Sequence, residues 1–175
     1  MPDNKTFILE VTPFKHIRML LPFLFASLCW SIASYILVDG GASSYVLLCI
    51  FALYSMVYAV PVIYIHYHYH RLSDGIIYTI SSDGISINKN DSRRVVKAEE
   101  IKSIKINGDT TGFSKLPSGV YYYAEIIIAD DEKLLITCLH SYKIEGILKE
   151  LFIGKNISFD KSGIAAFVPQ DDLPY

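Results

Sequence analysis

The chain has 175 residues and a mass of 19.7 kDa, which fits one or two small domains and excludes a large multidomain enzyme. Hydrophobic residues make up 51% of the chain and charged residues only 19%, so the composition excludes intrinsic disorder and is more apolar than an ordinary water-soluble domain. The net charge of −2 gives no indication of a nucleic-acid partner, and three cysteines, an odd number, do not form a disulfide framework.

Two long uncharged segments dominate the first part of the chain. They cover residues 19–38 and 44–65, and each is long enough to cross a hydrocarbon core of about 30 Å at about 1.5 Å per residue. Because only residues 39–43 separate them, we expect two transmembrane helices that form an antiparallel hairpin. Pro61 lies about one turn from the end of the second segment, where it can kink the helix.

The basic residues predict how this hairpin is oriented. Lys5, Lys15 and Arg18 precede the first segment, and Arg71 follows the second, whereas the connecting loop contains no Lys or Arg. Positively charged residues stay on the cytoplasmic side of a membrane. We therefore expect residues 1–18 to form a cytoplasmic N-terminal segment, and both termini to be cytoplasmic.

Histidine and tyrosine alternate directly after the second segment. On a helix His66 and His70 would share one face while His68 points the other way, and on an extended strand all three would share a face. Since histidine is a common metal ligand and titrates near neutral pH, one hypothesis is a metal-binding or pH-responsive site formed by these three residues. The interpretation that we favour is a belt of aromatic side chains at the level of the lipid headgroups.

The hydrophobic period becomes strand-like after Ser73. Residues 76–80 and 85–87 flank Asp83-Gly84, a pair that is typical of a type I′ hairpin turn. Ile101 is out of step with the alternating residues after it, which predicts a bulge or turn at the start of a strand. Further strands are expected at residues 93–97, 101–106, 120–129 and 133–138.

A helical period closes the domain. Apolar residues recur at i, i+3, i+4, i+7 and i+8, which predicts an amphipathic helix that covers one end of the sheet. These residues are Ile144, Ile147, Leu148, Leu151 and Phe152. We therefore place a domain at residues 72–153 and a tail at 154–175, and we regard Asn107–Gly119, the longest irregular stretch, as a candidate contact loop.

The segments Tyr78–Ile87 and Ala98–Ile104, followed by the closing hairpin and helix, resemble the pleckstrin-homology-like (PH-like) domains of bacterial membrane proteins. The resemblance implies an α+β membrane protein. Its fold would be an N-terminal transmembrane helical hairpin and a curled antiparallel sheet of about six to seven strands, capped by a C-terminal helix. It also implies a multi-pass protein of the bacterial inner (cytoplasmic) membrane, and it implies no reaction. The tryptophan that often precedes the acidic-Ile step in this family is replaced here by Ala98 or Glu99.

Six basic residues on adjoining predicted strands are candidates for binding headgroups or a partner, because lipid-binding relatives in eukaryotes use basic residues around the first hairpins. They are Lys89, Arg93, Arg94, Lys97, Lys102 and Lys105. Glu99 and Glu100 lie among them, so the alternative is an ordinary solvated strand face.

No motif predicts catalysis or a cofactor, since the chain has no G-x-S-x-G, phosphate loop, H-E-x-x-H or C-x-x-C sequence. We expect a non-enzymatic, membrane-anchored interaction module whose partners are membrane lipids and a protein, without nucleic acid; self-association is left open. The alternative is an immunity or inhibitor protein that neutralises a membrane-acting toxin. A third hypothesis is a metal- or pH-responsive protein that uses His66, His68 and His70.

Overall fold

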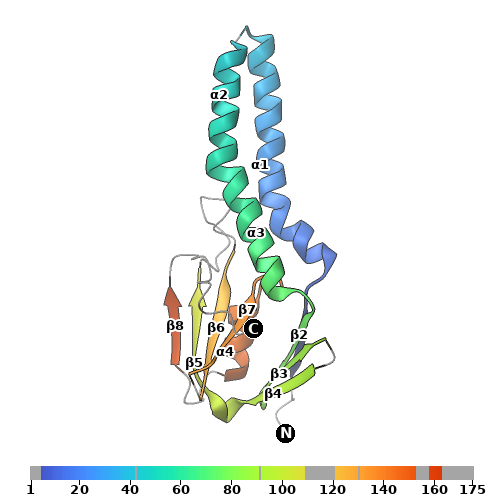
Figure 1. Cartoon of the computed structure of the whole chain (residues 1–175), viewed down its shortest axis with the longest axis vertical. Helices are drawn as coiled ribbons and strands as arrows, with labels where there is room; N and C mark the ends of the chain where they lie inside the picture. Colours follow the sequence, from blue (N-terminus) through green and yellow to red (C-terminus); the bar gives the residue numbers. More distant parts are fainter. Residues whose placement is uncertain are drawn as a thin grey trace.

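The computed structural model describes residues 5–41, 43–90, 92–108, 121–129, 131–152 and 158–162. Figure 1 shows two long helices that stand on a small domain built from two curled sheets. The elements in chain order are β1 (Thr6–Glu10), α1 (Pro13–Asp39), α2 (Ser44–Tyr54), a π-helical turn (Ser55–Ala59), α3 (Val60–Ser73), β2 (Ile76–Ser81), β3 (Gly84–Lys89), β4 (Ser92–Lys97), a 3₁₀ turn (Ala98–Glu100), β5 (Ile101–Asn107), β6 (Tyr123–Ile128), β7 (Lys133–Thr137), α4 (Ile144–Phe152) and β8 (Ser158–Ser162).

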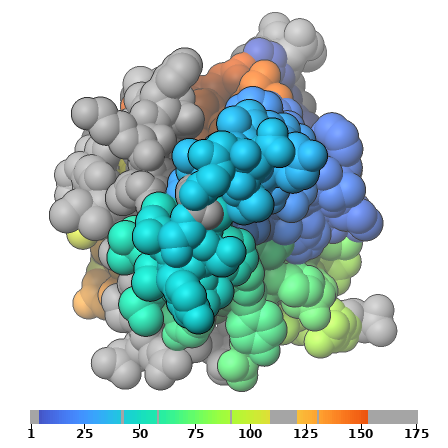
Figure 2. All heavy atoms as spheres, turned by 90° about the horizontal axis from the view of Figure 1, so that it is seen from above, coloured from blue at the N-terminus to red at the C-terminus, as the bar shows by residue number. Residues whose placement is uncertain are grey.

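The helical hairpin projects away from the domain. By length and composition, α1 and the continuous helix Ser44–Ser73 are each long and apolar enough to cross a membrane, and in their most apolar stretches only 0% and 6% of the residues are buried. Seen from above, the two helices lie side by side over the domain (Figure 2). They contact each other through Tyr54, whose ring stacks on Trp30 at 5.6 Å and whose hydroxyl lies 3.0 Å from the Ser27 hydroxyl.

Proline accounts for the irregular turns of the hairpin. Pro61 has no N–H to donate to the carbonyl of Val57, and the helix opens into a π-helical turn at Ser55–Ala59, which contains Val57. The predicted irregularity at Pro61 therefore takes the form of this π turn. Figure 1 also shows the first turns of α1 lying aslant to the rest of the helix, and Pro22 inside α1 interrupts its hydrogen bonds in the same way.

Two four-stranded sheets enclose the core of the domain. The first has the order β1-β2-β3-β4 and the second the order β7-β6-β5-β8; all pairs are antiparallel except β5 and β8. Helix α4 packs against them with Ile144, Leu148 and Phe152 fully buried, which confirms the predicted apolar face. β8 was not expected, because it comes from the segment predicted as a tail.

The first strand changes the layout that the sequence suggests. Residues 1–18 were expected to lie outside the domain, but Thr6–Glu10 pairs with β2 in the register Ile8 to Thr79. The helical hairpin is therefore an insertion between the first and second strands of one sheet. A five-residue strand whose partner lies far along the chain leaves no turn motif beside it, and only its single fully buried residue, Leu9, marks the inner face.

The hairpin of β2 and β3 is confirmed, but its turn is not the predicted type I′ turn over Asp83-Gly84. Gly84 already pairs with Ser81, so Ser82 and Asp83 form the turn, and Asp83 does not have a positive φ. Glycine is needed at 84 for a different reason. A Cβ there would lie 2.1 Å from the carbonyl oxygen of Val96, so only glycine permits this close approach of β3 and β4.

The entry to β5 behaves as predicted. A 3₁₀ turn precedes the strand, and the register with β6 shifts between Ile101 and Ser103. From residue 109 on, the candidate contact loop Asn107–Gly119 lies outside the described residues.

Candidate functional site at the junction of hairpin and domain

Three histidines meet where the hairpin joins the domain. His16 comes from the first turns of α1, and His66 and His70 lie one turn apart on α3. The Nδ1 atom of His16 lies 3.0 Å from Nε2 of His66, and Nδ1 of His66 lies 2.9 Å from the hydroxyl of Tyr121, just before β6. The rings of His16 and His70 pack edge to face with centroids 4.9 Å apart. We refer to His16, His66, His70 and Tyr121 as the histidine cluster.

The hydrogen bonds of the histidine cluster require neutral imidazoles or a single added proton. A neutral ring has one donor and one acceptor nitrogen, so the bonds can run from His16 through His66 to Tyr121 or in reverse. If His66 takes one proton, it donates to both neighbours. If His16 and His66 are both protonated, two N–H groups face each other across 3.0 Å, and the bond between them is lost.

Burial favours the neutral form of this pair. It is the largest cause that lowers the pKa of His66 below its ordinary value of 6.5, and the nearby His16 and His70 lower that pKa further. Burial also lowers the pKa of His16, with His70 acting in the same direction and the carboxylate of Asp74 opposing both. At pH 7 both rings are therefore neutral and the chain of hydrogen bonds is intact.

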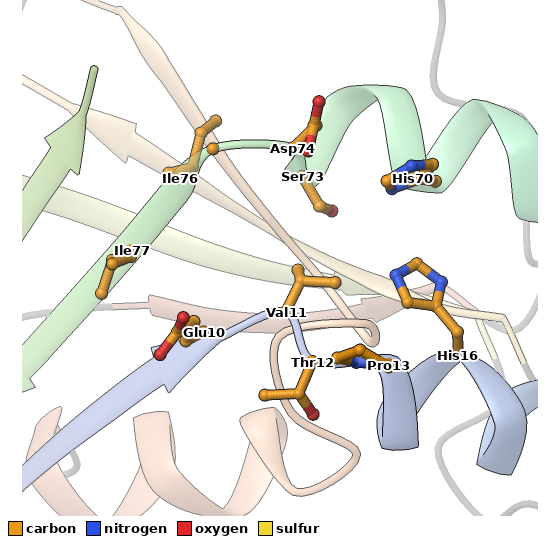
Figure 3. A pocket seen from close by; sticks show the side chains of 11 residues that line it. Glu10, Val11, Thr12, Pro13, His16, His70, Ser73, Asp74, Ile76 and Ile77 are labelled. Carbon is orange, nitrogen blue, oxygen red and sulfur yellow. The ribbon is translucent and has the colours of Figure 1, made fainter.

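A pocket of about 230 Å³ adjoins the histidine cluster. It is lined by the two segments that connect the hairpin to the first sheet, Glu10–Pro13 and Ser73–Ile77, together with His16 and His70. Figure 3 shows the two imidazoles facing each other from α1 and α3 at one end of this pocket. The pocket thus lies at the two points where the chain enters and leaves the hairpin.

A second, fully buried chain of hydrogen bonds attaches α3 to the second sheet. The hydroxyls of Ser73 and Thr137 are 2.5 Å apart, Thr137 Oγ1 is 3.3 Å from His140 Nδ1, and His140 Nε2 is 3.3 Å from the carbonyl oxygen of Ile76. Since a carbonyl only accepts, Nε2 carries the proton and Nδ1 accepts from Thr137, which in turn accepts from Ser73. Burial lowers the pKa of His140 to about 4, so the ring is neutral.

The His–Tyr alternation splits between two surfaces of α3. Tyr69 is buried against the rings of Tyr121 and Tyr123, with centroids 5.5 and 6.3 Å apart, and burial raises its pKa. His68 stacks on Tyr64 at 6.4 Å, away from the histidine cluster. The predicted trio is thus not brought together; instead His16, which no pattern in the sequence singles out, joins His66 and His70. Among the residues that the structure describes, no three His, Cys, Asp or Glu side chains are placed to hold a metal ion.

The structure divides the six predicted basic residues between two sheets. Lys89, Arg93, Arg94 and Lys97 lie on β3 and β4, and Lys102 and Lys105 lie on β5. Arg93 Nε donates to the Ser86 hydroxyl at 3.1 Å. Arg94 forms a two-pronged ion pair with Glu132, and Lys102 Nζ lies 2.8 Å from Asp131. Both acidic partners belong to the turn between β6 and β7, at the end of the domain opposite the helices (Figure 1).

A different pair of cations lies at the base of the hairpin. The guanidinium of Arg18 is 3.7 Å from the ring centroid of Tyr142, and the ammonium of Lys143 is 5.5 Å from the same centroid. Within the described part of the chain, neither cation is paired with a carboxylate. In the sequence Arg18 predicts only the orientation of the hairpin, and nothing near Tyr142 indicates that the two residues meet.

Comparison with known proteins agrees with this architecture. The PH domain family profile matches residues 8–141, from within β1 through the hairpin to the residue that precedes Tyr142. The chain therefore belongs to the PH domain family. PH domains are in general non-catalytic interaction modules that bind lipids or proteins. No curated protein and no solved structure matches the chain.

Proposed function

We propose that this chain is a membrane-anchored, non-enzymatic interaction module of the bacterial inner membrane, in which the helical hairpin holds the PH domain at the cytoplasmic face. One observation carries the proposal: the hairpin is inserted between β1 and β2 and stands clear of the domain that it belongs to. Because both ends of the hairpin enter the same sheet, the domain stays at the base of the helices wherever the hairpin is held.

The exposed side chains of the helices support a lipid environment. The exposed large apolar residues along α1 and the helix that follows it are 46–82% exposed, and among them Leu21, Phe25 and Leu28 are at 58, 67 and 58%. Apolar surface left in water costs about 25 cal/mol per Å², and soluble monomers do not expose apolar surface along two whole helices. A bilayer covers this surface without any further protein.

The charges at the base of the hairpin support a cytoplasmic domain in contact with headgroups. Lys15, Arg18 and Arg71 all lie at this end, and the loop at the other end has only Asp39. Arg18 directly precedes the predicted spanning segment, so its cluster with Tyr142 and Lys143 is at headgroup depth. Anionic lipid there would stabilise the docked domain by about 1 kcal/mol per basic residue.

The native cysteines allow a direct test of the anchor. Cys29 and Cys49 are exposed on the helices, whereas Cys138 is buried in the domain. In washed membranes a membrane-impermeant maleimide should label none of them, and after denaturation in detergent it should label all three. Extraction of the protein by alkaline carbonate, or labelling of Cys29 and Cys49 in intact membranes, would contradict the proposal.

A further inference from the structure

We propose that the histidine cluster is a proton-sensitive contact that holds the start of α1 against α3 at neutral pH and releases it in mildly acidic conditions. The contact joins three elements, because His16 belongs to α1, His66 and His70 to α3, and Tyr121 to the entry of β6. This role goes beyond anchoring, and it does not depend on the identity of any partner.

The balance of donors and acceptors explains why protonation opens the contact. When both imidazoles are neutral, each of the two hydrogen bonds, His16 to His66 and His66 to Tyr121, has one donor and one acceptor. One proton added to His66 still leaves each bond with a donor and an acceptor. A second proton removes the only acceptor between His16 and His66. Two adjacent positive rings then repel each other in a half-buried site, and His70 stands 4.9 Å from the first of them.

The surroundings offer a protonated His16 an alternative position. From the connecting segments, the carboxylates of Glu10 and Asp74 line the pocket beside it, and the pocket has room for an imidazolium ring. From α1, the ammonium of Lys15 is held by the backbone carbonyls of Glu10 and His140, so it already has acceptors of its own. Just before β6, the Tyr121 hydroxyl faces His66, and burial raises the pKa of this tyrosine, so it stays neutral.

Opening the contact would free the first turns of α1 to move relative to α3, which stays attached to the second sheet through Ser73 and Thr137. The chain connects the hairpin to the first sheet through two short segments, Val11–Thr12 and Asp74–Gly75, and Gly75 has a φ of +68°. The bond between His66 and Tyr121 keeps a donor and an acceptor when His66 is protonated, so the bond that opens is the one between His16 and His66. Protonation is therefore expected to act on the geometry of the junction and to leave the two sheets intact.

The test uses the full chain in lipid nanodiscs, with hydrogen exchange measured at pH 7.5 and 5.0 and corrected for the intrinsic effect of pH. We expect exchange in the first turns of α1 to rise about tenfold at pH 5.0, which corresponds to a difference of one pK unit between the closed and the open contact. The buried strand β3 should not change, since the sheets stay folded.

Two variants and a matched control make the test specific. His66→Gln keeps a donor and an acceptor but takes no proton, so its exchange should stay low at both pH values, and His16→Gln should do the same if His66→Gln does not fold. His68→Gln changes the same residue type on the other surface of α3 and should respond as the unmodified chain does. An unmodified chain without the rise, a rise that persists in His66→Gln and His16→Gln, or its loss in His68→Gln would overturn the proposal.

Discussion

Replacing Thr137 by valine is expected to weaken the attachment of α3 to the second sheet. The loss of stability should be larger than for the removal of any contact at the surface. The substitution keeps the shape of the side chain and removes the hydroxyl that accepts from Ser73 and donates to His140. Ser73 and His140 are both 0% exposed, so neither group gains a water molecule in exchange. A buried polar group left without a partner costs about 1–3 kcal/mol, and two such groups give an expected loss of about 3 kcal/mol.

The assay is thermal unfolding of the full chain in detergent, followed by circular dichroism. For a chain of this size a loss of about 3 kcal/mol lowers the Tm by about 6–12 °C. Thr79→Val is the matched control, because Thr79 lies on the half-exposed outer row of the first sheet and the same change there should stay within about 0.5 kcal/mol. Adding Ser73→Ala to Thr137→Val should recover part of the loss, since it removes one of the stranded groups. Equal Tm values for the two valine variants would refute the reasoning.

Three further predictions follow from burial, backbone geometry and charge. The pKa of His140 is lowered to about 4 in the folded chain and is about 6.5 in the unfolded chain, so the unfolded chain takes up the proton first as the pH falls. The free energy of unfolding should therefore be unaffected by this residue above pH 6.5 and should fall by about 3 kcal/mol between pH 6.5 and 4. Urea unfolding across that range should show this loss, and His140→Gln should reduce the loss. Gly84→Ala should destabilise the fold by more than about 1 kcal/mol, because the added Cβ meets the Val96 carbonyl. Gly146→Ala lies in α4 with open space around it and should stabilise the fold by up to about 1 kcal/mol. Similar Tm values for the two variants would contradict this. Arg18→Gln with Lys143→Gln should lower the share of phosphatidylglycerol that native mass spectrometry detects on the chain, whereas Arg93→Gln with Lys97→Gln should leave it unchanged, and the reverse result would move headgroup binding to the β4 face.

Local patterns in the sequence were sufficient for much of the fold. The periodicity of Ile144 to Phe152 predicts α4, and the uncharged segments predict the two long helices, because each pattern reports on residues close together in the chain. The bulge at Ile101 was also visible as a break in alternation. β1 could not be found in this way, since its partner β2 lies beyond the whole hairpin.

The candidate site was accessible only in part, for the same reason. Helical spacing correctly places His66 and His70 on one surface and His68 on another. The partners that complete the cluster, His16 and Tyr121, come from other elements, and nothing in the sequence near them indicates a contact. For the six basic residues, the sequence shows the charges but not their partners. In the fold, Arg94 and Lys102 each form an ion pair with an acidic residue of the β6–β7 turn.

The central claim, a hairpin that crosses the membrane from within a PH domain, is tested most directly by labelling one cysteine at each end of the molecule. Ser43→Cys lies at the start of α2, beside the loop of the hairpin, and Ser82→Cys lies in the turn between β2 and β3. An impermeant maleimide should label Ser43→Cys only in spheroplasts and Ser82→Cys only in inverted vesicles. Labelling of both positions from the same side would contradict the account.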